Sequence, residues 1–129
     1  MVEFILNGKL DIEPLITTRD FLAKALEEAK SELEIAGAIQ AFEVCFELAW
    51  KTCKKVLSLR GIDVYTPKEV FRIAGLEGLI SQSENWFEYV DKRNITVHQY
   101  EKKILQIVYP ILTNFLKDLD SLIVNLKKL

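Results

Sequence analysis

The chain has 129 residues, of which 50% are hydrophobic and 28% are charged, and its formal net charge is −2 at pH 7. This length predicts one domain with a full core, and the slight acidic excess argues against a surface that coats nucleic acid generally. No apolar run reaches the roughly 18 residues of a membrane span, and the N-terminus lacks a signal-peptide pattern. We therefore expect a cytoplasmic protein that does not associate with membranes.

Residues 1–14 are expected to form an N-terminal arm or hairpin, followed by a helical domain over residues 15–129. Residues 2–12 have a strand-like composition around Asn7-Gly8, a pair that favours a type I′ hairpin turn. An isolated hairpin is only marginally stable, so a loose arm is the alternative.

Apolar spacing predicts helices after Pro14. The first amphipathic segment extends from Asp20 to about Ser31, with Phe21 on its apolar side. The second extends from about Glu32 to Arg60 and ends at Gly61, a residue typical of helix C-termini.

The two cysteines, Cys45 and Cys53, lie in this second helix. Their spacing of eight residues is about two turns, or roughly 12 Å of rise, which is too long for a mutual disulfide. We expect both to be buried free thiols.

The second half of the chain contains further helix signals. Thr66-Pro67-Lys68-Glu69 is typical of a helix start, and Ser81-Gln82-Ser83-Glu84 resembles a second capping box. The helix after that box is expected to end near Arg93-Asn94. The last helix is expected over about Val97 to Leu126, with a bend at Pro110. Together these segments predict an all-α, up-and-down bundle of about five helices.

Most of the reactive chemistry lies in the string from Asp91 to Tyr100, which contains Arg93, Asn94 and the single histidine, His98. In an unbroken helix, Arg93 and His98 would diverge by about 140° around the axis. The β-branched run at residues 95–97 favours a break between them, and Asn94 tolerates the left-handed conformation that ends helices. We interpret Thr96 as the N-cap of the last helix, with Gln99 completing a capping box and His98 in the first turn.

On this interpretation the segment is suited to cleave RNA without a metal. His98 would accept the proton of a ribose 2′-hydroxyl, while Arg93, Asn94 and the helix N-terminus would hold the phosphate. The field of that N-terminus and the charge of Arg93 both predict a neutral His98. The second proton transfer would fall to water, to Tyr100 or to His98 of a second subunit. A purely structural histidine beside an arginine is the competing explanation.

Glu43 and Glu47 lie four residues apart on one helix face. A carboxylate pair of this kind can bind a metal, but Lys51 continues the face and favours a Glu47–Lys51 ion pair. A contact from one glutamate to Arg93 is the more plausible role. We therefore expect no metal site and no cofactor.

The string Arg-Asn-x-x-x-His-x-Tyr resembles the Arg-(x4–6)-His motif of HEPN domains, which are helical bundles that include many metal-independent ribonucleases. Residues 39–52, Ile-Gln-Ala-Phe-Glu-Val-Cys-Phe-Glu-Leu-Ala-Trp-Lys-Thr, resemble the signature of one HEPN branch. That branch is the nucleotidyltransferase substrate-binding protein family, encoded beside a minimal nucleotidyltransferase. Pro67-Lys68-Glu69 and Trp86 also fit its pattern, and the resemblance covers roughly residues 18–126.

The resemblance implies a five-helix homodimer that pairs with the transferase in a toxin–antitoxin manner. Arg93 and His98 match the catalytic pair, and Asn94 matches the polar residue that supports it. The resemblance further implies that the transferase silences the ribonuclease by adding AMP to the motif tyrosine, here Tyr100. The RNA substrate is unspecified, although the acidic balance favours a structured target such as tRNA.

Two alternatives stay open at this point. The protein could be a non-catalytic substrate-binding or regulatory subunit of the transferase. It could also be a helical bundle whose motif only holds a dimer together.

Overall fold

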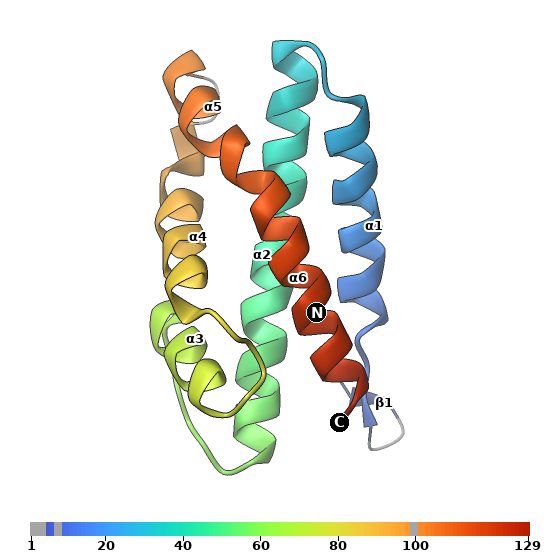
Figure 1. Cartoon of the computed structure of the whole chain (residues 1–129), viewed down its shortest axis with the longest axis vertical. Coiled ribbons are helices and arrows are strands. Elements are labelled where there is room, and N and C mark those ends of the chain that lie inside the picture. The colour runs from blue at the N-terminus through green and yellow to red at the C-terminus, as the bar shows by residue number, and fades with distance from the viewer. Residues whose placement is uncertain (1–4, 7–8, 99–100) are drawn as a thin grey trace.

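The protein is a bundle of α-helices preceded by a short pair of strands (Figure 1). The computed structural model describes the backbone of residues 5–6, 9–98 and 101–129, and the side chains of residues 10–97 and 101–129. The helices are α1 (Glu13–Glu28), α2 (Glu32–Leu59), α3 (Pro67–Leu76), α4 (Ser83–Ile95), α5 (Lys102–Val108) and α6 (Leu112–Lys127). Two 3₁₀ turns, η1 (Thr96–His98) and η2 (Tyr109–Ile111), flank α5. The expected all-α bundle is confirmed.

Figure 1 shows α1, α2 and α4 lying lengthwise, with α6 packed across them. The helix expected over about Val97 to Leu126 is divided into α5 and α6 by η2, which contains Pro110. The missing N–H of proline leaves the Gln106 carbonyl without its helical donor, so a bend at this point was predictable. None of the helices in the described ranges is both long and apolar enough to cross a membrane.

Strands β1 (Ile5–Leu6) and β2 (Lys9–Leu10) pair antiparallel, with Ile5 opposite Leu10 and Leu6 opposite Lys9. This pairing agrees with the expected short hairpin. Asn7 and Gly8, on which that expectation was based, lie outside the described residues.

The first helix begins seven residues earlier than its apolar pattern predicts. It starts at Glu13, with Pro14 in its first turn, and the Glu13 N–H donates to Asp11 Oδ1 at 3.0 Å. Proline suits this position because its fixed φ matches the helix. The expected apolar side is also partly wrong, because Phe21 is 66% exposed whereas Leu15 and Leu22 are buried.

Helix α2 has the bounds that the sequence predicts. Ser31 accepts from the Glu34 N–H at 3.1 Å, and the Glu34 carboxylate accepts from the Ser31 N–H at 3.0 Å, which completes a capping box. The helix ends before Gly61, whose φ of 81° lies in the left-handed region. The buried positions of α2, from Ala38 to Leu57, line the core.

Helix α3 begins as expected, with Thr66 accepting from the Glu69 N–H at 3.3 Å and Pro67 as the first helical residue. The second capping box, expected at Ser81-Gln82-Ser83-Glu84, is not formed. Helix α4 begins at Ser83 after an N-cap residue, Gln82, that makes no side-chain cap. The Ser83 hydroxyl instead donates to the Phe71 carbonyl on α3 at 3.1 Å, so it joins the two helices.

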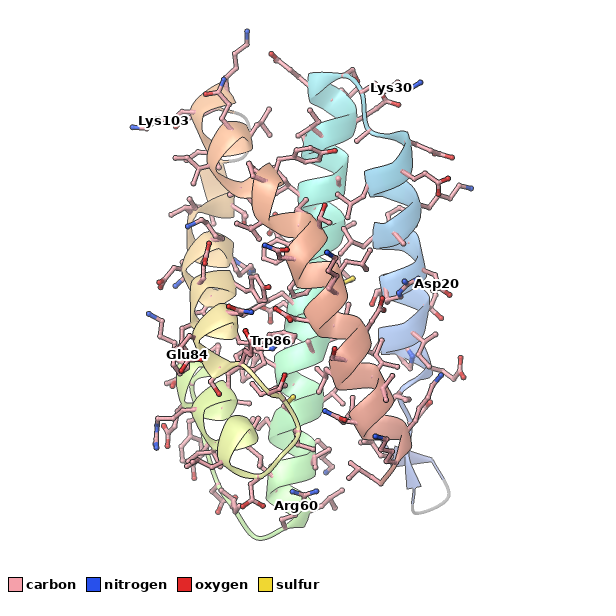
Figure 2. All side chains as sticks on the ribbon, in the orientation of Figure 1. Asp20, Lys30, Arg60, Glu84, Trp86 and Lys103 are labelled. Carbon is pink, nitrogen blue, oxygen red and sulfur yellow. The ribbon has the colours of Figure 1, made fainter. Side chains whose placement is uncertain are left out.

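The core is rich in aromatic rings from four helices. Phe115 of α6 is fully buried, and its ring centroid lies 4.8 Å from Phe42, 5.2 Å from Tyr89 and 5.7 Å from Trp86. Trp86, labelled in Figure 2, also stacks on Phe71 at 4.6 Å. This packing fixes α4 against α2 and therefore determines where the last turn of α4 lies.

Cys45 and Cys53 are both buried and free, as expected. Burial raises the pKa of Cys53 to about 12 and that of Cys45 to about 11. Neither thiol is therefore suited to act as a nucleophile near neutral pH.

Candidate functional site

Arg93 lies in the last turn of α4, where it faces the middle of α2. Its Nη2 atom is 3.5 Å from Glu47 Oε1, and the two side chains are 27% and 37% exposed. The Arg93 Nε atom is buried and has no hydrogen-bond partner among the described residues. The guanidinium is thus held on one side by a carboxylate and keeps unused donor capacity.

Glu47 is shared among three partners. Its Oε2 atom accepts from the Trp50 indole N–H at 3.2 Å and lies 3.7 Å from Lys51 Nζ. The Glu47–Lys51 pair was expected from the spacing, and a contact from one of the two glutamates to Arg93 was expected as the more plausible role; both are present. Trp50 was missed as a partner, although its position three residues after Glu47 places it on the same helical face.

Glu43 lies one turn before Glu47. Burial raises the pKa of Glu43, and the positive charge of Arg93 and the Thr96 hydroxyl oppose that rise, while the charge of Glu47 adds to it. Within the described ranges, no group of three or more histidine, cysteine, aspartate or glutamate side chains is arranged to hold a metal ion.

The interpretation of Thr96 as a helix N-cap is wrong. Helix α4 continues through Asn94 to Ile95, and Thr96 is its C-cap. The Thr96 side chain is buried, and its hydroxyl donates to the Arg93 carbonyl at 2.8 Å. Asn94 is therefore helical and exposed rather than a left-handed helix end. The α-helix does end within the β-branched run, at Ile95, and the chain then forms the 3₁₀ turn η1.

His98 is the last residue of η1 and does not lie in the first turn of the next helix. Helix α5 begins at Lys102, after Glu101 as N-cap, so the N–H groups of that helix start several residues beyond His98. The expected anion site at a helix N-terminus beside His98 is therefore wrong. The His98 side chain and Tyr100 lie outside the described residues, so the neutral state of His98 stays a prediction.

Of the expected site residues, the structure brings two into contact, Arg93 and Glu47. Arg93 and Glu47 come together from α4 and α2, whereas Asn94 is exposed. A half-buried arginine next to a short turn that carries the only histidine is an arrangement that can bind a phosphate beside a proton acceptor.

Comparison with known proteins agrees with this fold. Residues 11–128 match the family described as nucleotidyltransferase substrate binding protein like. The chain belongs to this family. The family recognised from the sequence is thereby confirmed.

Individual proteins are also similar to this chain in sequence or in structure. A protein of Haemophilus influenzae named as a probable ribonuclease HepT is 36% identical over 99 residues, which cover 73% of this chain and 68% of that protein. The structure of HI0074 from Haemophilus influenzae, described as the fold of a substrate binding domain of a nucleotidyltransferase, is 29% identical with a TM-score of 0.81. The match covers 91% of this chain and 99% of that one.

Two further solved structures share the fold. A protein of Thermus thermophilus is 27% identical with a TM-score of 0.81, and the match covers 87% of this chain and 98% of that chain. A chain from a toxin–antitoxin structure with AMP-PNP has a TM-score of 0.58 over 88% of this chain and 98% of that chain. At 15% identity, this last similarity shows the fold alone.

Proposed function

We propose that the protein is a HEPN-type endoribonuclease that needs no metal ion for cleavage. The observation that carries the proposal is the position of Arg93, held by Glu47 at the end of α4 and followed directly by the turn that contains His98. The relation to a probable ribonuclease at 36% identity supports it.

In the proposed reaction, His98 accepts the proton of a ribose 2′-hydroxyl. The 2′-oxygen attacks the adjacent phosphorus, the bond from phosphorus to the 5′-oxygen breaks, and that oxygen leaves after taking up a proton. The products are a 2′,3′-cyclic phosphate and a 5′-hydroxyl. Arg93 stabilises the negative charge that develops on the phosphate oxygens, and Asn94 assists from the same turn. Water, Tyr100 or His98 of a second subunit supplies the proton to the leaving oxygen.

Glu47 acts as a positioning residue in this scheme. A free arginine side chain loses rotamer entropy when it binds phosphate, and an ion pair that fixes the guanidinium beforehand reduces that loss. The carboxylate also competes with the phosphate for the guanidinium, so a moderate contact at 3.5 Å suits the role better than a bidentate one.

We further propose control by a cognate minimal nucleotidyltransferase in the cytoplasm. The Tyr100 hydroxyl would attack the α-phosphorus of ATP, with pyrophosphate as the leaving group and AMP attached to the tyrosine. The added bulk and negative charge, two residues after His98, would exclude the RNA phosphate from Arg93. We propose a homodimer as the active form and a structured RNA such as tRNA as the substrate.

A second function is supported by a specific observation. The family description and the HI0074 structure both refer to substrate binding for a nucleotidyltransferase, so a non-catalytic subunit of that enzyme is the competing proposal. It predicts a stable complex with the transferase and no RNA cleavage.

The deciding experiment is incubation of the purified protein with total RNA in EDTA, beside folded variants Arg93→Ala and His98→Ala. The ribonuclease proposal requires cleavage by the wild type alone and 2′,3′-cyclic phosphate ends. If neither wild type nor variants cleave, while the wild type binds the neighbouring transferase, the second function replaces the first.

A further inference from the structure

An exposed tyrosine lies on the same side of α2 as the Arg93–Glu47 pair. Tyr65 is in the connection from α2 to α3, at the end of the bundle where α2 finishes (Figure 1), and it is 71% exposed. Lys54 Nζ is 5.4 Å from the centroid of the Tyr65 ring and 6.0 Å from that of Trp50. Trp50 in turn donates to Glu47. Consecutive contacts therefore join Arg93 to Tyr65 along one face of α2.

The high exposure of Tyr65 indicates a role other than core packing. A ring as exposed as Tyr65 adds little to the hydrophobic core. A cation–π contact with Lys54 orients the ring but leaves most of its surface in water. An ordered aromatic ring next to a lysine is the combination with which proteins hold single-stranded nucleic acid, where the ring stacks on a base and the cation contacts a phosphate.

The distance from the proposed active site fits a short stretch of RNA. Glu47 and Lys54 are seven residues apart on one helix, which corresponds to about 10 Å of rise. Arg93 lies beside Glu47 and Tyr65 lies beside Lys54, so a few nucleotides of one RNA strand can span the two points. Lys51, on the same face, adds positive charge between the two points.

We propose that Tyr65, Lys54 and Trp50 form a base-stacking subsite for an unpaired nucleotide of the RNA substrate, a few nucleotides from the cleaved phosphate. Tyr65 stacks on the base, Lys54 contacts the neighbouring phosphate, and Trp50 supports the Lys54 side chain. This inference rests on the ribonuclease proposed above. It also explains how a chain with a net charge of −2 binds RNA, because the contacts are local.

Binding is measured separately from cleavage to test the subsite. In the His98→Ala background, a fluorescein-labelled, unstructured 12-nucleotide RNA is titrated by anisotropy, with a duplex of the same length beside it. Tyr65→Leu removes the ring but keeps apolar volume, and Tyr65→Phe keeps the ring. Leu76→Ala is the control, because Leu76 is 76% exposed at the end of α3 and makes none of these contacts.

We expect Tyr65→Leu to weaken binding of the single strand about tenfold, because loss of one base stacked on an aromatic ring lowers affinity by about fivefold or more. Tyr65→Phe and Leu76→Ala should stay within about twofold of the parent, and the duplex should bind weakly to all of them. Lys54→Gln should lower the slope of log K against log salt by about one. Equal binding by Tyr65→Leu and the parent, or no binding of the single strand by the parent, overturns the subsite.

The two proposals fail in different ways. Tyr65-dependent binding without cleavage by the wild type would refute the ribonuclease and leave the subsite intact. Cleavage by the wild type with an unchanged KM in Tyr65→Leu would refute the subsite and leave the ribonuclease intact.

Discussion

Replacing Glu47 with glutamine tests whether the carboxylate positions Arg93. Glutamine keeps the size of the side chain and an oxygen that can accept from Trp50, so the substitution mainly removes charge. At 3.5 Å, two unit charges attract by about 5 kcal/mol with an effective dielectric constant near 20. Because both side chains are about one third exposed, solvent screening and side-chain entropy reduce the net stabilisation to about 1 kcal/mol.

We expect Glu47→Gln to lower the free energy of unfolding by about 1 kcal/mol, measured in urea by circular dichroism. If the same interaction orients Arg93 in the transition state, kcat should fall about fivefold, since 1.4 kcal/mol corresponds to tenfold. The rate is measured on total RNA in EDTA. A double-mutant cycle with Arg93→Gln should give a coupling energy of about 0.5–1 kcal/mol.

Glu77→Gln is the matched control. Glu77 pairs with Arg60 at 3.2 Å, and these side chains are 34% and 35% exposed, but the pair joins the ends of α2 and α3, away from Arg93. The Glu77→Gln protein should lose a similar amount of stability and keep full activity. A Glu47→Gln protein that equals the wild type in both stability and activity would refute the positioning role.

Further predictions concern the core. Phe115→Ala should lower the free energy of unfolding by about 3–5 kcal/mol, because it leaves a cavity among three aromatic rings; a loss below 1 kcal/mol in urea would contradict that packing. Gly75→Ala should cost about 1–3 kcal/mol in the same assay, because its Cβ would overlap the Ser83 hydroxyl; equal stability would show that Ser83 moves freely. Cys45 and Cys53, whose thiol pKa values are raised to about 11 and about 12, should resist Ellman's reagent at pH 8 until urea unfolds the protein, and rapid labelling of the native state would contradict their burial.

The sequence predicts the helices well where apolar periodicity and end signals agree. Helix α2 has both a long apolar stripe and Gly61 at its end, and its bounds were predicted closely. The start of α1 was missed because the segment from Glu13 to Arg19 has few apolar residues, so the periodic signal begins late. In that segment Pro14 was the better guide, since it favours a first helical turn.

The candidate site was predicted less completely, for a physical reason. The Glu47–Lys51 pair follows from helix spacing and charge, which a sequence displays, whereas the Glu47–Arg93 contact joins two helices and depends on how they pack. The role of Thr96 does not follow from the sequence either. A threonine near a helix end can cap the next helix, or its hydroxyl can bond a carbonyl of the helix that precedes it. Burial of Thr96 against α2 decides in favour of the second, and burial of this kind depends on tertiary packing.

The 3₁₀ turn η1 separates the placement of Arg93 from the placement of His98, which one continuous helix would couple. Arg93 is fixed by its partner on α2, so the register of α4 cannot shift without breaking that pair. Within η1, Thr96 is buried and its hydroxyl bonds the Arg93 carbonyl, whereas Val97 is exposed, so a residue can be inserted or removed after Thr96 without moving the guanidinium. HEPN motifs allow four to six residues between arginine and histidine, and in this fold a change of that length can be absorbed by the turn. Engineered changes in the spacing should therefore be made after Thr96, where they alter the reach of the histidine and preserve the contacts that hold the arginine.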